Sequence, residues 1–335
     1  RRKRRRSKLS RIPIAVVGIG AFGRNHLRAL RKSERAQLAG VFDINRERAA
    51  SVSEGACPVF SSLEDLPAAG VQAAVVAAPT SEHEPVASRL LELGMDVLVE
   101  KPIAHDISAA RRLVDLAARQ GRILQVGHLE RFNPAIVALK AITRVPLFFE
   151  IHRLSVFSPR SLDVDVVLDL MIHDIDILLD LVGKRPEEIR AAGLSILSGK
   201  VDIANVRMAF PGGCVANLTA SRVSTERVRK LRLFQPHQYI SVDYQRQDAT
   251  AFTVSPDKQI GFQALNVVKD EPLRLEVEDF LECCATRQRP RVAGEDGLAA
   301  LEVAAGIIAR IEEHTRVVAS ALQSPGLDLP ATGSI

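Results

Sequence analysis

The sequence predicts a two-domain α/β protein, in which a doubly wound parallel sheet is followed by an α+β domain with a large, mostly antiparallel sheet. Up to about residue 144, short apolar segments of strand length alternate with segments of helix length, which is typical of parallel βαβ units. Beyond that point, a run of strand-length segments is joined by short turns, which favours antiparallel hairpins. A chain of 335 residues is also long enough for two cores.

The individual elements follow from hydrophobic periodicity and from glycine and proline positions. In the first part we expect strands at residues 14–17, 37–42, 73–77, 97–99 and 123–126, and helices at residues 25–32, 46–53, 84–93 and 108–119. In the second part we expect strands at residues 147–154, 189–197, 201–210, 214–223, 230–234, 239–243 and 251–254, and helices at residues 166–181, 273–286 and 297–314.

The composition disfavours several classes of function. Aromatic residues make up 4% of the chain and tryptophan is absent, so stacking on nucleic-acid bases is not expected. There is no run of 18 apolar residues, and a membrane-spanning helix is therefore not predicted. The four cysteines lack zinc-site spacing and are expected to be reduced thiols, which indicates a cytoplasmic protein without a metal site: Cys57, Cys214, Cys283 and Cys284.

The positive charge of the chain is concentrated at its N-terminus. Eight Lys and Arg residues precede residue 12, so removing them from the net charge of +5 leaves the rest of the chain at −3. Contact with nucleic acid or anionic lipid is one interpretation of this run. We favour a basic tail outside the fold, whose removal would leave catalysis unchanged. A signal peptide is not expected, because the apolar residues that follow serve as the first strand.

A glycine-rich turn follows that first strand and predicts a dinucleotide site. Gly18, Gly20 and Gly23 form a G-x-G-x-x-G pattern that opens a helix, and Asp43 lies twenty residues beyond it. The first glycine makes the tight turn, the second admits the pyrophosphate to the helix N-terminus, and the third permits close packing. Asp43 would bind the adenine ribose hydroxyls, which favours NAD over NADP, although Arg46 could tolerate a phosphate. Two residues inside the turn join the predicted cofactor site: Ala21 and Phe22.

Two further groups of residues are candidates for the chemistry. Glu100, Lys101 and Pro102 follow directly what we count as the fifth strand, at the edge of the sheet where ligands bind. A lysine there can polarise a substrate hydroxyl. Asp169 and His173 are four residues apart in a predicted helix and would share a face, so the carboxylate could orient the histidine as a general base. A buried structural histidine among solvated helix acids remains an equal alternative from spacing alone.

These motifs, in this order, resemble the glucose-fructose oxidoreductase/inositol dehydrogenase/MocA family, over roughly residues 12–320. The resemblance includes the segment beginning at Pro79-Thr80 and ending at His83, which lies near the nicotinamide in the family. It implies a Rossmann domain with bound NAD, and a sugar or polyol dehydrogenase. It also implies that His173 is the base, that Asp169 is its partner and that Lys101 polarises the hydroxyl.

Residues 127–134 resemble the branch of the family that acts on UDP-linked N-acetyl sugars. This implies oxidation of UDP-N-acetylglucosamine at C3, in lipid A or surface-polysaccharide synthesis. Arg131 and Arg160 would then meet the diphosphate and Asn133 an amide or hydroxyl, although surface charge and a turn cap are equally good interpretations of these residues. The alternatives are an inositol, hexose or UDP-N-acetylglucosaminuronate dehydrogenase, and a non-catalytic NAD-binding sensor.

The predicted organisation is therefore a basic tail at residues 1–11, a Rossmann domain at 12–130, a substrate-binding and oligomerisation domain at 131–323, and a flexible tail at 324–335. A flat antiparallel sheet offers a natural surface for a homodimer or homotetramer.

Overall fold

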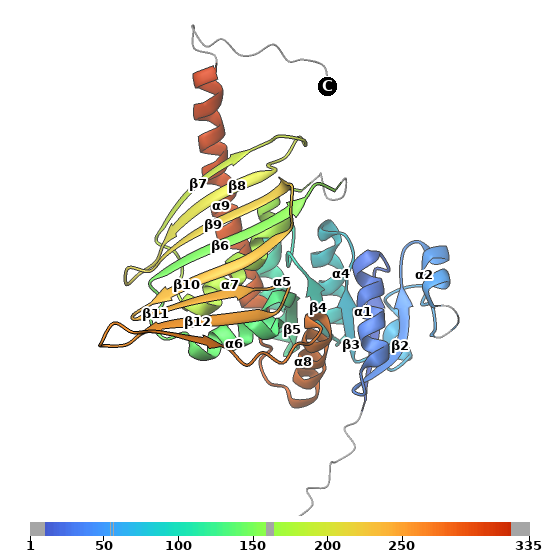
Figure 1. Cartoon of the computed structure of the whole chain (residues 1–335). Coiled ribbons are helices and arrows are strands. Elements are labelled where there is room, and N and C mark those ends of the chain that lie inside the picture. The colour runs from blue at the N-terminus through green and yellow to red at the C-terminus, as the bar shows by residue number, and fades with distance from the viewer. Residues whose placement is uncertain (1–10, 54, 56, 159–163, 323–335) are drawn as a thin grey trace, which may run out of the picture.

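Two β-sheets, one parallel and one mostly antiparallel, organise the protein (Figure 1). The computed structural model describes residues 11–322 except 54, 56 and 159–163. The first sheet has five parallel strands in the order β2-β1-β3-β4-β5. Its strands are β1 (Ile12–Val17), β2 (Ala36–Phe42), β3 (Ala73–Val76), β4 (Asp96–Glu100) and β5 (Leu124–Gly127), and its helices are α1 (Ala21–Lys32), α2 (Arg46–Ser53), α3 (Asp65–Ala68), α4 (Thr80–Glu92) and α5 (Ile107–Gln120).

The strands of this sheet are short and apolar because helices cover both of their faces. Every residue of β3 and β4 is buried, so these strands show no alternation of polar and apolar residues.

Helix α5 shows how local interactions fix the two ends of a helix. The Asp106 side chain accepts a hydrogen bond from the Ala109 amide at 2.7 Å, and Gly121 ends the helix in the left-handed region at φ 61°.

The second sheet has eight strands in the order β13-β12-β11-β10-β6-β9-β8-β7, and only β6 and β9 pair in parallel. Its strands are β6 (Phe148–Val156), β7 (Glu188–Leu194), β8 (Ile203–Ala209), β9 (Val215–Ser224), β10 (Val228–Gln235), β11 (Gln238–Asp243), β12 (Asp248–Val254) and β13 (Ile260–Ala264). The helical elements of this half are η1 (Leu129–Phe132), α6 (Pro134–Ile142), η2 (Val167–Met171), α7 (Ile172–Val182), α8 (Pro272–Thr286) and α9 (Gly294–Leu322).

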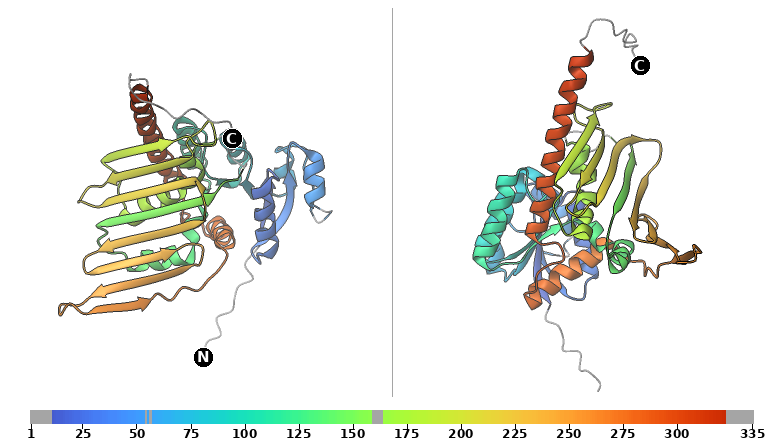
Figure 2. Two further views of the ribbon diagram at one scale, coloured as in Figure 1. Left: turned by 45° about the horizontal axis from the view of Figure 1, so that its top comes forward. Right: turned by 90° about the vertical axis from the view of Figure 1, so that its left-hand side faces the viewer.

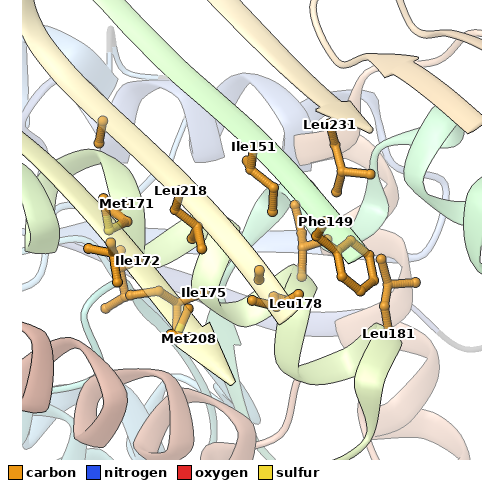
Figure 3. Close-up of a cluster of buried hydrophobic side chains, with 14 of the residues drawn as sticks. Phe149, Ile151, Met171, Ile172, Ile175, Leu178, Leu181, Met208, Leu218 and Leu231 are labelled. Atoms are coloured by element: carbon orange, nitrogen blue, oxygen red, sulfur yellow. The ribbon is translucent and has the colours of Figure 1, made fainter. Parts of the chain in front are cut away.

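Helices α7 and α9 lie on one face of the large sheet, and no helix of the described residues lies on its opposite face (Figure 2). Alternate residues of β6, such as Phe149 and Ile151, point into the core formed with α7. Ile172, Ile175 and Leu178 fill that core from the helix side (Figure 3). The large sheet is therefore half-buried, and its strands alternate as such sheets require.

Helix α8 returns from the second sheet to the first. Val277, Phe280 and Leu281 are buried in one cluster with Ile14 and Val16 of β1. The C-terminal part of the chain thus completes the core of the parallel sheet. The predicted domains, divided at residue 130, had placed this part in the other domain. The exact domain boundaries remain predictions.

The predicted fold class is confirmed, with differences in detail. Lys101 follows β4, which is the fourth strand of the chain and not the fifth, and the short helices α3 and η1 were not predicted. Strand β13 was missed because every residue in it is exposed, and α6 was missed because its short apolar run has weak helical periodicity. The predicted helix at residues 166–181 is real, but its first turn, η2, is a π-helix.

Two further expectations concern individual residues and helices. The four cysteines are buried thiols without disulfide bonds, and burial raises the pKa of each of them. Within the described residues, no helix is long and apolar enough to cross a membrane, and no group of three or more His, Cys, Asp or Glu side chains is arranged to hold a metal ion.

Candidate active site

The glycine turn between β1 and α1 leaves space for a ligand on one side only. Gly18 has φ +87°, and a Cβ on it would lie 2.7 Å from the Ala77 backbone. A Cβ on Gly23 would lie 2.0 Å from the Gly18 carbonyl oxygen, whereas a Cβ on Gly20 would meet nothing within 4 Å. Gly18 and Gly23 are therefore required by internal packing, and the open side at Gly20 is where a pyrophosphate can approach the backbone.

The N-terminus of α1 is suited to an anion. Gly20 occupies the N-cap position without a side-chain hydrogen bond, and the first turn contains no acidic residue. Ala21 and Phe22 begin the helix with exposed side chains, and that of Phe22 is 54% exposed. The first amides of the helix are not capped by a side chain, and their partial positive charge favours a phosphate. The residues present thus fit a dinucleotide.

Asp43 lies beside this turn at the end of β2. Its Oδ2 accepts a hydrogen bond from the Ile19 amide at 2.7 Å, and its Oδ1 accepts one from the Asn45 amide at 2.8 Å. Burial raises the pKa of Asp43, but hydrogen bonds from Arg48 and from these two amides outweigh burial and leave the pKa below its usual value. The carboxylate is therefore ionised and held where an adenine ribose would lie.

The segment after β3 is tied to the loop after β4 by a histidine. Pro79 caps α4 and Thr80 is its first residue. The His83 ring lies 2.8 Å from the Pro102 carbonyl oxygen through Nδ1 and 2.9 Å from the Ala78 carbonyl oxygen through Nε2. Because both ring nitrogens face protein carbonyls, His83 holds the two loops together and shapes the cofactor site through them.

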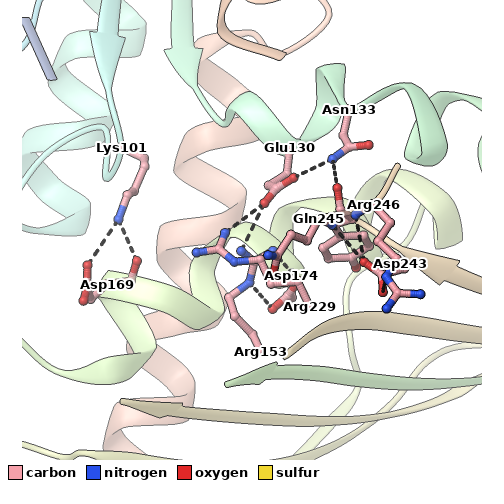
Figure 4. Close-up of polar contacts among 11 residues, drawn as sticks. Lys101, Glu130, Asn133, Arg153, Asp169, Asp174, Arg229, Asp243, Gln245 and Arg246 are labelled. Carbon is pink, nitrogen blue, oxygen red and sulfur yellow. Dashed lines mark hydrogen bonds and ion pairs between the residues drawn. The ribbon is translucent and has the colours of Figure 1, made fainter. Parts of the chain in front are cut away.

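Lys101 reaches from the end of β4 to the start of the helix in the second half (Figure 4). Its Nζ donates to the Asp169 carbonyl oxygen at 2.7 Å and lies 3.7 Å from the Asp169 Oδ1. Burial lowers the pKa of Lys101, and the charges of Asp169 and Glu100 oppose that shift. The lysine is thus a buried ammonium group with one carboxylate partner at a sheet edge where ligands bind.

A buried carboxylate sits directly behind Lys101. Glu100 is 6% exposed, and its Oε1 lies 2.6 Å from Nε2 of His26 on α1. A Cβ on Gly127 would come within 2.9 Å of the Glu100 carboxylate, so the glycine makes room for it. Burial, followed by the charge of Glu100, raises the pKa of the nearby Glu276 well above its usual value. The loop that begins at Lys101 is therefore anchored in a buried polar cluster. The sequence analysis did not identify two members of this cluster, His26 and Glu276.

His173 is the second residue of α7 and is 9% exposed. Its ring meets that of His128 edge to face, with 6.0 Å between the ring centroids. Burial lowers the pKa of His173 well below its usual value, and the positive charges of Lys101, Arg153 and others add to the effect. The imidazole is accordingly neutral at neutral pH, as a general base must be before reaction.

The expected contact between Asp169 and His173 is not the one that the structure forms. Asp169 lies inside the π-helical turn η2, where the hydrogen-bond step is i to i+5 and not i to i+4. The Asp169 carboxylate pairs with Lys101. Burial and the positive charges of Lys101 and Arg153, and not a neighbouring carboxylate, lower the pKa of His173.

Two arginines lie side by side in the large sheet, and the positive charges of both act on His173. Buried carboxylates compensate these charges. Arg153 and Arg229 are opposite each other in the β6–β10 ladder. Arg153 is fully buried, with Nε 2.7 Å from the Asp174 Oδ2 and Nη1 3.1 Å from the Glu130 Oε1. Arg229 contacts the same Glu130 oxygen at 3.3 Å, but its side chain is 28% exposed (Figure 4). No simple spacing in the sequence links these four residues.

Three of the residues predicted to bind the substrate, Arg131, Asn133 and Arg160, are not joined to Lys101 or His173 by a hydrogen bond or ion pair in the described part of the structure. Arg131 is buried and ion-paired with Asp180 at 3.1 Å, and it donates to the Arg291 carbonyl oxygen at 2.8 Å. Asn133 caps α6 through the Ala135 amide and donates to Glu130. Protein groups occupy both side chains, which favours a structural role and argues against our assignment. Arg160 lies outside the described residues.

Comparison with known proteins agrees with this geometry. Residues 12–128 match the model of the GFO/IDH/MocA oxidoreductase family, an NAD-binding Rossmann fold, and residues 143–237 match the model of the GFO/IDH/MocA C-terminal domain. UDP-N-acetylglucosamine 3-dehydrogenase of Acidithiobacillus ferrooxidans is 40% identical over 296 residues, which are 85% of this chain and 93% of that protein. Inositol 2-dehydrogenase of Rubrobacter xylanophilus is 31% identical over 233 residues, which are 65% of this chain and 67% of that protein.

A solved structure of the Acidithiobacillus dehydrogenase superposes with a TM-score of 0.86 at 36% identity, covering 91% of this chain and 99% of that one. An aldose-aldose oxidoreductase from Caulobacter crescentus shares the fold, with a TM-score of 0.79 at 20% identity over 90% of this chain and 98% of that one. The parallel sheet with its glycine turn, the second sheet and the whole-length similarity agree: this chain belongs to the GFO/IDH/MocA family of NAD-dependent oxidoreductases.

Proposed function

We propose that this protein oxidises the C3 hydroxyl of UDP-N-acetylglucosamine to the 3-keto sugar, with NAD as the hydride acceptor. The observation that carries the proposal is the 40% identity to a UDP-N-acetylglucosamine 3-dehydrogenase over 93% of that protein's length. The position of Lys101 and His173 at the carboxyl edge of the parallel sheet supports the same chemistry. That edge is where a nicotinamide would lie if its pyrophosphate occupied the glycine turn.

Each catalytic residue has one task in this proposal. The neutral His173 ring accepts the hydroxyl proton, while the hydrogen on C3 leaves with its electron pair and the C–O bond becomes double. A bound NAD would supply the hydride acceptor. Lys101 donates to the substrate oxygen and stabilises negative charge that develops there before the ketone forms. Asp169 positions Lys101 through the contacts at 2.7 and 3.7 Å.

Arg229 is a better candidate than Arg131 for the cation that binds the diphosphate. The positive charges that lower the pKa of His173 include those of Lys101, Arg153 and Arg229. Arg153 is fully buried, whereas Arg229 reaches the surface and shares the carboxylate of Glu130 with Arg153. A guanidinium with an incompletely compensated charge beside the base is suited to a phosphate.

This placement links substrate binding to the strength of the base. Burial, together with the cations around His173, makes the free imidazole a weak proton acceptor. A diphosphate that binds near them brings compensating negative charge, so it raises the proton affinity of His173 when substrate is present. A substrate with a diphosphate would thus be oxidised faster than a free sugar, in addition to being bound more tightly.

The second candidate function is an inositol dehydrogenase, because the Rubrobacter relative with that name is 31% identical. Its substrate has no diphosphate, so replacement of Arg229 would hardly change its oxidation. UDP-N-acetylglucosaminuronate remains a third substrate, which would need a further cation for its carboxylate. A non-catalytic sensor is disfavoured because Lys101, Asp169 and His173 occur together.

A wider role follows from the substrate. Formation of the 3-keto sugar would serve lipid A or surface-polysaccharide synthesis in the cytoplasm.

We also propose a homodimer or homotetramer that covers the open face of the large sheet. An aromatic ladder crosses that face through Phe148, Phe234, Tyr239 and Phe252 to Phe262, with ring centroids 4.8–5.7 Å apart. Light scattering would test this proposal: a Phe234→Glu variant should become monomeric, and an unchanged assembly would contradict it.

The substrate is tested by following NADH absorbance with four compounds side by side: UDP-N-acetylglucosamine, its uronic acid, myo-inositol and glucose. Glutamate and an aminotransferase are added to remove the ketone from an unfavourable equilibrium. We expect reduction of NAD with UDP-N-acetylglucosamine. Reduction with inositol or glucose alone would contradict the substrate and leave only the family assignment.

A further inference from the structure

The carboxylate expected to bind the adenine ribose is already fully used inside the protein. Asp43 is 4% exposed and accepts four hydrogen bonds, two at each oxygen. The amides of Ile19 and Asn45 provide one bond to each oxygen and build the turn itself. Arg48 provides the other two through a guanidinium fork, from Nε at 3.1 Å and from Nη2 at 2.7 Å.

This fork is positioned by the first turn of α2. The Arg48 amide donates to the Asn45 side chain at 2.9 Å, which fixes the start of the helix beside Asp43. The side chain of Arg48 is 40% exposed, while that of Asp43 is 2% exposed. The arginine therefore covers the solvent side of the carboxylate, which is the side from which a ribose must approach.

We propose that Arg48 determines cofactor specificity by competing with the ribose of NAD for Asp43. A carboxylate offers about four lone-pair positions, and here all four have donors. The 2′- and 3′-hydroxyls of NAD can reach Asp43 only when the two bonds from Arg48 are given up. The 2′-phosphate of NADP, in contrast, would find a guanidinium at the place where a bare aspartate would repel it.

Arg48 thus reduces the preference of the protein for NAD over NADP, but NAD still binds more tightly than NADP. It weakens NAD binding by occupying Asp43, and it reduces the penalty on NADP by neutralising the same charge. Arg46 is the other basic residue at the start of α2, and it has no hydrogen bond or ion pair to Asp43 in the structure, which makes it a matched control. This inference is independent of the sugar that the enzyme oxidises.

The test is the dissociation constant of each cofactor, measured by calorimetry without substrate on the parent and on Arg48→Ala and Arg46→Ala variants. Because a partly exposed ion pair is lost, Arg48→Ala should bind NAD about two- to fivefold more tightly. Loss of a charge-assisted contact to phosphate should weaken NADP binding, so the ratio of the two constants should increase about tenfold or more. Arg46→Ala should leave the dissociation constant of NAD unchanged, because Arg46 does not occupy Asp43.

A double-variant cycle separates competition from other roles. In an Asp43→Ala background, Arg48→Ala should no longer improve NAD binding, because no carboxylate remains to be released. Weaker NAD binding in Arg48→Ala would overturn the proposal and show that the guanidinium contacts NAD itself. An unchanged ratio in a variant that melts like the parent would overturn it as well.

Discussion

The two halves of the active site are built by different means. The cofactor turn depends on backbone geometry and on the absence of side chains at Gly18 and Gly23, all within a short stretch of sequence. The catalytic centre depends on buried charges from β4, β6, β10 and α7, which are far apart in the sequence. The first kind of site can be recognised from spacing, whereas the second needs the folded chain.

The buried charges under His173 should give the largest effect on stability. An Asp174→Asn variant keeps the shape of the side chain but leaves the fully buried Arg153 with Glu130 as its remaining carboxylate. Breaking such a pair costs about 3–5 kcal/mol. A matched control is Glu150→Gln, which removes an exposed pair with Arg232 on the outer face of the same sheet and should cost about 1 kcal/mol or less. Urea unfolding of both variants measures the difference, and equal losses would contradict the account.

The reacting groups should affect turnover and not cofactor binding. We expect Lys101→Ala and His173→Ala each to lower kcat by roughly a hundredfold or more, which is the usual effect of removing an acid–base group. The dissociation constant of NAD should stay near the parent value, because neither residue belongs to the glycine turn. Parent turnover in His173→Ala would exclude His173 as the base.

The same histidine predicts a pH dependence. Because burial and neighbouring cations lower the pKa of His173, its ring stays neutral as the pH falls to and below the ordinary histidine value. The acid limb of kcat/KM for the free enzyme should therefore lie well below pH 6.5. A limb centred at or above that value would mean that another group is the base.

Two substitutions separate the packing role of the glycine turn from its role in cofactor binding. Gly23→Ala places a Cβ 2.0 Å from a backbone oxygen, so it should destabilise the cofactor-free protein by about 1–3 kcal/mol. Gly20→Ala meets nothing within 4 Å, so it should leave the stability of the cofactor-free protein nearly unchanged and weaken NAD binding. Melting with and without NAD separates the two effects, and equal melting of the cofactor-free variants would contradict this division.

The last prediction concerns the pH dependence of stability, to which the buried Asp176 contributes without taking part in the reaction. Burial raises the pKa of Asp176 from 3.8 to about 7, so the folded protein binds this proton more strongly than the unfolded chain does. The resulting stabilisation is complete below about pH 4 and is lost as the pH rises through about 7. An Asp176→Asn variant lacks this loss, so its stability relative to the parent should increase between pH 5 and pH 8. A constant difference would show that the aspartate titrates normally.

The sequence predicted most of the fold because its signals are local. Apolar runs and the turn glycines each act within a few residues, and they predict the parallel sheet and its nucleotide site. Lys101 and His173 could be proposed for the same reason, since each lies in a short motif. The contact between Asp169 and Lys101 could not be predicted, because it joins residues 68 positions apart, and spacing rules for a regular helix do not describe the π-helix η2.

The remaining differences share one physical origin. Arg131 was a candidate for the diphosphate with surface charge as an equal alternative, and folding brings it to Asp180 from a different helix. Arg229 drew no notice because its neighbour in the sheet, Arg153, is 76 positions earlier in the chain. Charges find partners through tertiary packing, so their roles cannot be inferred from spacing along one strand or helix.

The central claim is that hydride leaves C3 of the sugar of a nucleotide sugar and reaches NAD beside Lys101 and His173. The most direct test is UDP-N-acetylglucosamine with deuterium at C3, incubated with enzyme and NAD and analysed by mass spectrometry of the reduced cofactor. We predict one deuterium in the NADH that forms, and a protiated cofactor when the deuterium is placed at C4 or C6 of the sugar. Reduced cofactor without deuterium from the C3-labelled substrate, or with deuterium from another position, would contradict the account.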